Sequence, residues 1–251
     1  MIDETLARIP SPMQRVNPCA RVLAAVMLSF SAALSENFIL LWVYFILSLA
    51  FTAAASIGVA GAARRLKPLF WFVVMIWVVL PLTFEGEAFS RLGPLVFTQP
   101  GLELCAKITM KSITILLFFS SLIATMTIAS LGNALHRLHV PDKAVFLLLM
   151  TYRYISVIQC EYKRLLRAAH LRGFKSRTSL HSYKTYAYLA GMLFVRASCR
   201  AKRVHQAMVC RGFTGRFHTI DLFESNGVSR VFLAGVSFVT LVLLLGERLW
   251  L

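Results

Sequence analysis

The stretch FILLWVYFILSLAFTAAASIGVA, residues 38–60, contains no charged residue. An α-helix needs about 20 apolar residues to cross the hydrocarbon core of a bilayer, so this run is long enough to span it. Hydrophobic residues make up 58% of the chain and charged residues 15%, against about 45–50% and 25% in soluble domains. We therefore predict an all-α polytopic membrane protein with about five transmembrane helices, in which the other apolar runs lie near residues 16–34, 66–84, 102–131 and 231–245.

The positive charge of the chain, +16 in total, is concentrated between His136 and His218. That block holds 16 Lys and Arg residues and only two acids, Asp142 and Glu161. Loops rich in Lys and Arg stay on the cytoplasmic side of a membrane. We predict a membrane domain of four spans at residues 1–131, a cytoplasmic region at 132–230 and a last span at 231–251, with the N-terminus inside.

Three smaller features of the apolar part lead to expectations of their own. Arg21 is expected to snorkel out of the first span. Residues 85–101, rich in Gly and Pro, are expected to form an external loop. Glu103, Lys107 and Lys111 recur every four residues. We interpret them as a solvated helix end with i,i+4 pairing, and a gate or ion-path role is the alternative.

The cytoplasmic block contains an internal repeat. Residues 160–177 (CEYKRLLRAAHLRGFKSR) and 199–216 (CRAKRVHQAMVCRGFTGR) share eight of 18 positions at an offset of 39. Each copy has a basic, helix-compatible stretch that ends in Arg-Gly-Phe, where the glycine indicates a helix stop. More apolar segments, residues 144–158 and 183–197, precede the copies. Such a duplication implies two equivalent partner sites or one two-fold symmetric partner.

The composition of the repeated tip suits a protein interface. A guanidinium can bind a carboxylate through two hydrogen bonds, and glycine lets another backbone approach closely. Phe supplies an apolar anchor, and Arg with an aromatic is typical of interface hot spots. Attraction to anionic lipid head groups is the alternative. It explains scattered Lys and Arg, but not a six-residue pattern repeated with its Gly and Phe.

The two Arg-Gly signatures after basic helices resemble the paired motifs of the energy-coupling factor (ECF) transporter T component, in particular its cobalt-transport branch CbiQ. The resemblance extends over nearly the whole chain, from Asn17-Pro18 through LHVPDKAVFLLLMTYRYI at residues 138–155. In that family, long cytoplasmic coupling helices dock two ATPase subunits.

Carried over by position, the resemblance assigns Arg172 and Arg211 as the docking arginines, with the glycines and phenylalanines that follow them: Gly173, Phe174, Gly212 and Phe213. Leu171 and Cys210 stand where the family motif usually has Ala. That departure weakens the motif match and leaves the role of the arginines in place.

Chemistry that the sequence does not show also contributes to the prediction. The spans contain Cys105 but no cluster of His, Cys or carboxylates, and the chain has no G-x-x-x-x-G-K-[ST] pattern. His136 and His139 are expected to have a structural or surface role. We therefore expect no catalytic activity, metal or cofactor in this chain, and ATP with Mg²⁺ bound by partner ATPases.

The expected function is thus that of the coupling subunit of an ATP-driven importer in the inner membrane. Its expected partners are two ATPase subunits, a substrate-binding membrane subunit and the bilayer, with no nucleic acid. Cobalt as the cargo comes from the family resemblance alone, and nickel or a vitamin are alternatives. A stand-alone carrier or an integral-membrane enzyme would show polar or catalytic residues in the spans.

Overall fold

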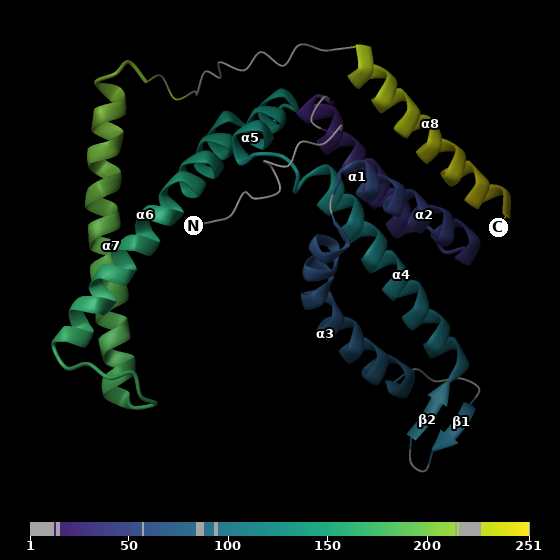
Figure 1. Ribbon diagram of the computed structural model, residues 1–251, viewed down its shortest axis with the longest axis horizontal. Helices are drawn as coiled ribbons and strands as arrows, with labels where there is room; N and C mark the ends of the chain where they lie inside the picture. Colours follow the sequence, from purple (N-terminus) through teal and green to yellow (C-terminus); the bar gives the residue numbers. More distant parts are fainter. Residues whose placement is uncertain are drawn as a thin grey trace. The chain divides into compact units, whose positions relative to one another are not determined.

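The computed structural model describes residues 13, 16–56, 58–83, 88–92, 95–213, 215 and 227–250. Within them the chain forms eight helices and one hairpin (Figure 1). The elements are α1 (Pro18–Leu34), α2 (Phe38–Ala54), α3 (Val59–Thr83), β1 (Ala88–Leu92), β2 (Leu95–Thr98), α4 (Gln99–Leu122), α5 (Ile128–Arg137), α6 (Asp142–Leu171), α7 (Leu180–Val209) and α8 (Gly227–Trp250).

The hairpin corrects one expectation. Strands β1 and β2 pair antiparallel, with Arg91 opposite Val96 and Leu92 opposite Leu95, so residues 85–101 are not all loop, and the fold class stays helical. Both strands contain aromatic or β-branched residues, which favour extended structure and are easily overlooked in a short segment.

The chain divides into two compact units. A membrane unit contains α1 to α4, the hairpin, α5 as far as Ala134, and α8, while a coupling unit contains α6 and α7. The two cuts fall within α5 and between α7 and α8.

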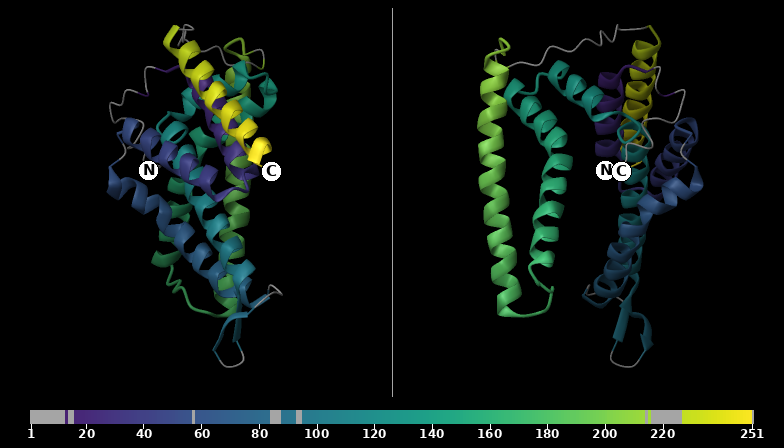
Figure 2. Two further views of the ribbon diagram at one scale, coloured as in Figure 1. Left: turned by 90° about the vertical axis from the view of Figure 1, so that its right-hand side faces the viewer. Right: turned by 60° about the vertical axis from the view of Figure 1, so that its left-hand side comes forward.

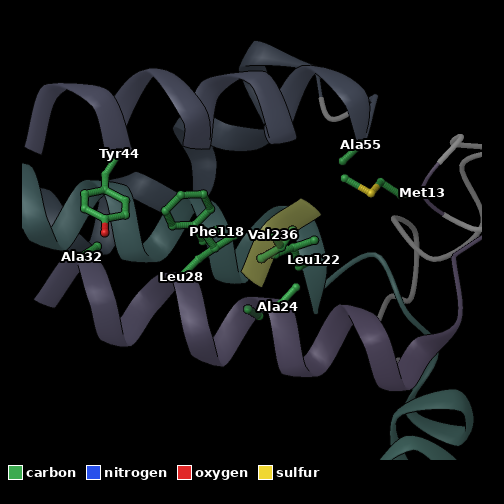
Figure 3. Close-up of a cluster of buried hydrophobic side chains, with 10 residues drawn as sticks. Met13, Ala24, Leu28, Ala32, Tyr44, Ala55, Phe118, Leu122 and Val236 are labelled. Carbon is green, nitrogen blue, oxygen red and sulfur yellow. The ribbon is translucent and has the colours of Figure 1, made fainter. Parts of the chain in front are cut away.

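One face of α1 forms the centre of the membrane unit. Ala24, Leu28 and Ala32 recur every four residues, are at most 1% exposed, and meet Tyr44 of α2 and Phe118 of α4 (Figure 3). The small alanines let neighbouring helices approach closely, which is how helices pack in a bilayer. The opposite surfaces expose large apolar side chains such as those of Phe30, Ile39, Trp42, Ile46, Phe70 and Trp71. Such surfaces suit a lipid environment.

Two of the predicted apolar runs have different boundaries in the structure. The run at residues 38–60 breaks after α2, where Ser56 adopts a positive φ of 54°, and α3 begins at Val59. The run at residues 102–131 breaks between α4 and α5. Hydrophobicity continues through both breaks, so hydropathy alone did not locate them.

The fold is that of a helical membrane protein, and the count of five spans stays a prediction. By length and composition, two helices of the described chain are able to cross a bilayer, α6 and α8. Helices α1 and α2 are apolar but have 17 residues each, about 25 Å, slightly less than the hydrocarbon core of about 30 Å.

The two lysines of the α4 stripe contact the end of α1 and the start of α2. Lys111 Nζ donates a hydrogen bond of 2.9 Å to the carbonyl of Ala33, and Lys107 Nζ lies 5.6 Å from the centre of the Phe38 ring. A cation near the last carbonyls of α1 satisfies acceptors that the helix leaves open. These contacts across helices take the place of the i,i+4 pairing that the spacing had suggested.

We expect Leu28→Ala to destabilise the membrane unit. Leu28 is fully buried, and truncation of such a side chain costs about 2–5 kcal/mol because a cavity remains. Phe30→Ala, on the exposed side of the same helix, is the matched control and should change the free energy of unfolding by less than about 0.5 kcal/mol. Thermal unfolding in detergent compares the two, and equal losses would contradict the packing described.

Candidate functional site

The coupling unit is a pair of long antiparallel helices. α6 and α7 have 30 residues each, so each apolar segment of the sequence and the basic stretch after it form one continuous helix. The two helices lie side by side with opposite chain directions (Figure 2). Three contacts join them along their length: Phe146 with Phe213 (ring centres 5.4 Å apart), Glu161 with Arg196 (2.5 Å), and Phe174 with Tyr186 (5.5 Å).

The central contact of the pair is ionic. Arg196 of α7 donates to Glu161 Oε1, and Arg164, one turn along α6, lies 3.7 Å from the other carboxylate oxygen. The hydrogen bond from Arg196 holds the pKa of the Glu161 carboxyl below its usual value. The carboxylate therefore stays ionised over the physiological pH range, and the crossing point of the two helices keeps its ion pair.

The chain leaves α6 through a Schellman motif. The amide of Phe174 donates to the carbonyl of Ala169 (3.1 Å), and the amide of Gly173 donates to that of His170 (3.0 Å). Gly173 has a φ of +85°, the left-handed conformation that this motif requires. Arg172, the last residue before this turn, is exposed at the tip.

The tip of α7 has the same hydrogen bonds at the offset of the sequence repeat. Phe213 donates to Met208 (3.1 Å), Gly212 donates to Val209 (3.0 Å), and Gly212 has a φ of +77°. Arg211 is exposed in the position equivalent to Arg172. Each residue of the second tip lies 39 positions after its counterpart in the first, so the repeat is structural as well as sequential. Arg216, the last residue of the repeated pattern, lies outside the described residues.

The two tips lie at opposite ends of the helix pair. Because the helices are antiparallel, the tip of α6 lies near the first turns of α7, and the tip of α7 lies near the start of α6. A helix of 30 residues is about 45 Å long, so the exposed arginines are separated by roughly that distance.

The phenylalanines of the tips contact the coupling unit itself. Phe174 is only 8% exposed and packs edge-on against Tyr186 and beside His170, whose Nδ1 lies 2.9 Å from the Phe174 carbonyl oxygen. Phe213 packs against Phe146. Phe174 and Phe213 therefore both pack within the coupling unit, and the expectation that they also anchor a partner stays a prediction. A hydrophobic residue after the glycine commonly accompanies a Schellman motif, which is the sequence signal for this internal role.

An apolar groove of about 560 Å³ lies between α6 and α7. Its lining includes Met150, Tyr154 and Ile158 of α6, and Phe194, Val204 and Met208 of α7. The Glu161–Arg196 pair lies at its edge. The coupling unit therefore combines exposed arginines at its tips with a largely apolar groove between its helices.

The histidines at the start of the coupling unit have structural contacts. His136 Nε2 lies 2.8 Å from Asp142 Oδ1, in the first turn of α6, and His139 adopts a positive φ of 62° between the two helices. The part of the chain that the structure describes holds no group of three or more His, Cys, Asp or Glu side chains that could bind a metal ion.

Residues 10–219 match the CbiQ family, described as cobalt transport protein. The chain belongs to this family. It is 26% identical to the energy-coupling factor transporter transmembrane protein EcfT of Heliobacterium modesticaldum over 217 residues, 82% of each chain. Its identity to EcfT of Ruminiclostridium cellulolyticum is 23%, over 90% of this chain and 92% of that protein. Its identity to the cobalt transport protein CbiQ of Salmonella typhimurium is 25%, over 59% and 68%.

The resemblance to the ECF T component is thus confirmed, and both tips lie within the matched residues. The docking role of Arg172, Gly173, Phe174, Arg211, Gly212 and Phe213 stays a prediction.

We expect Gly173→Ala to loosen the tip of α6. A side chain at this φ costs about 1–2 kcal/mol, so the Phe174 amide should exchange with solvent about 5- to 30-fold faster. Gly173→Asn should do less, since Asn tolerates the left-handed conformation. Amide hydrogen exchange measures both.

The control is Gly191→Ala in the interior of α7, where an added Cβ meets nothing within 4 Å and the φ is not positive. This change should leave exchange at Phe174 and Phe213 unaltered. If Gly173→Ala also leaves it unaltered, the left-handed turn does not close the helix.

Proposed function

We propose that this chain, the transmembrane component of an energy-coupling factor importer, transmits movement from two ATPase subunits through the tips of α6 and α7. The observation that carries the proposal is the identical hydrogen-bonded turn at both tips, each of which exposes an arginine. A duplicated turn on one helix pair suits two copies of one partner.

The charge and the spacing of the tips indicate how the partners bind. An exposed guanidinium can form two parallel hydrogen bonds with a carboxylate, so an acidic groove on each ATPase would accept one tip. The arginines lie about one helix length apart, about 45 Å, so one small groove cannot hold both. The Glu161–Arg196 pair fixes the crossing of the two helices, so a displacement of one tip would move both helices.

The cargo we propose is cobalt, bound by a separate membrane subunit. The family description and the name of the Salmonella relative both specify cobalt transport. The apolar groove between α6 and α7 and the apolar outer faces of α2 and α3 offer surfaces for such a subunit and for lipid.

We place the coupling unit at the cytoplasmic face of the inner membrane, although α6 is long and apolar enough to span. Its apolar half contains Arg153, and its C-terminal half contains four charged residues and a histidine: Glu161, Lys163, Arg164, Arg167 and His170. Unlike α6, α7 is not apolar enough to span, and it contacts α6 at three points, so we place both helices on the same side of the bilayer.

This placement predicts the labelling pattern of single cysteines. In a background without the five native cysteines, Ser176→Cys between α6 and α7 should not react with an impermeant maleimide added outside the cell. Asn37→Cys, between α1 and α2, is the control and should react. Reaction at residue 176 from outside would refute the topology.

The docking role predicts the effect of removing the tip arginines. Arg172→Ala and Arg211→Ala should each weaken ATPase binding by about 2–5 kcal/mol, because the opposing carboxylate is left unpaired. The double variant should lose the ATPase subunits, and Arg→Lys should rescue poorly because an ammonium lacks the planar fork. Co-purification from detergent and uptake of radioactive Co²⁺ measure these effects.

Lys163→Ala and Lys202→Ala are the matched controls, since both lysines are exposed on the same helices and removal of either changes the charge equally. These two substitutions should weaken ATPase binding much less than the arginine substitutions do. Losses that follow only the number of charges removed would favour lipid binding instead, and normal assembly and transport by the double arginine variant would refute the coupling mechanism.

A further inference from the structure

Arg21 is buried in the membrane unit, not extended toward the membrane surface as its sequence position had suggested. It lies in the second turn of α1 and is 3% exposed. Its Nη2 donates to Thr125 Oγ1, and that hydroxyl donates to the carbonyl of Ser121 in the last turn of α4 (2.8 Å). The guanidinium is thereby connected, through one hydroxyl, to the backbone at the C-terminus of α4.

A second arginine binds the same end of α4. Arg65 of α3 donates from Nη1 to Ser120 Oγ at 2.6 Å. Within the described residues, neither arginine belongs to an ion pair with a carboxylate. The partial negative charge at the C-terminus of a helix favours cations, which explains why two of them gather here.

The start of α1 also contacts α5, which precedes the coupling helices in the sequence, and α8, which follows them. The Asn17 amide donates to Ser229 Oγ in the first turn of α8 (2.9 Å). Cys19 Sγ lies 3.7 Å from the carbonyl oxygen of Ala134 in α5. Asn17 also caps α1, because its Oδ1 accepts from the Cys19 amide, and Pro18 begins the helix.

These contacts have one property in common. Thr125 and Ala134 lie where the chain leaves the membrane unit, and Ser229 lies where it returns. The start of α1 is therefore hydrogen-bonded to two parts of the membrane unit, the segment from which the chain leaves for the coupling helices and the helix at which it returns.

We propose that the start of α1 is a latch, formed by Asn17, Cys19 and Arg21, which makes the end of α4, α5 and the start of α8 move as one body during transport. This inference rests on the proposed function, since only a chain driven through α6 and α7 needs such a link. Movement of the coupling helices reaches the membrane unit through both connections. With the latch closed, it reaches the centre of the bundle through α1.

Arg21 is the positioning residue of this latch. A buried cation that loses its hydrogen-bond acceptor costs far more than a neutral group that loses one, so the contact with Thr125 favours a single arrangement. An apolar side chain at position 21 would pack among the helices but would not select one position of the α4–α5 connection.

The first experiment measures amide hydrogen exchange of the full-length protein in nanodiscs. In Arg21→Met, exchange should become about tenfold faster at residues 123–134 and also at the start of α8, near Ser229, because the latch links both. Residues around Leu28 should keep their protection. Arg64→Met is the control, since it removes an exposed charge at the position before Arg65. It should leave exchange unchanged at residues 123–134 and at the start of α8.

The second experiment tests the direct contact. Thr125→Val should accelerate amide hydrogen exchange at residues 123–134 more than Arg21→Met does. The reason is that Thr125→Val leaves the buried guanidinium of Arg21 without its hydrogen-bond acceptor. The double variant Arg21→Met/Thr125→Val should resemble Arg21→Met alone. Additive effects, or a change confined to residues 123–127 with α8 unaltered, would overturn the latch.

The third experiment measures coupling in the complex with its ATPase subunits. Arg21→Met should keep the ATPases and hydrolyse ATP within about twofold of wild type, while Co²⁺ uptake per ATP falls about tenfold. Arg21→Lys, which can still donate a hydrogen bond to Thr125, should restore part of the Co²⁺ uptake per ATP. A wild-type ratio in Arg21→Met refutes the latch, whereas a wild-type complex that takes up no Co²⁺ refutes the proposed cargo and leaves the exchange tests decisive.

Discussion

The left-handed glycine after each coupling helix is the constraint on which the rest of the coupling unit depends. Gly173 and Gly212 can adopt positive φ at little cost, and so the chain turns back over the last carbonyls of each helix. This turn exposes the preceding arginine and directs the following phenylalanine onto the other helix. A β-branched residue in place of either glycine would remove all three consequences together.

The antiparallel pairing follows from the same turns. Each phenylalanine covers the start of the opposite helix, so the two tips hold the two ends of the pair while Glu161 and Arg196 hold its centre. The exposed arginines then lie at opposite ends of the helix pair. The internal repeat thus duplicates both the exposed arginine and the contact that keeps the two copies together.

The sequence was sufficient for the parts of the fold that depend on local pattern. Apolar runs without charge indicated membrane helices, and the repeat located both tips with their glycine stops. The sequence was not sufficient where a contact with a residue far along the chain determines the structure. The repeat does not predict that Phe174 packs against Tyr186, and the break after α4 lies within an apolar run that no local signal divides.

Arg21 and Arg172 show how much the role of an arginine depends on its surroundings. Both lie near a helix end, one beside the C-terminus of another helix and one at the tip of its own. Arg172 is exposed, so a partner can reach its guanidinium, whereas Arg21 is buried and can only bind within the chain. If the tips receive force from the ATPases, the buried arginine would, as part of the proposed latch, hold the segment that passes this force to the bundle. The same chemistry, a guanidinium against helix-end acceptors or carboxylates, would then operate at both ends of the path.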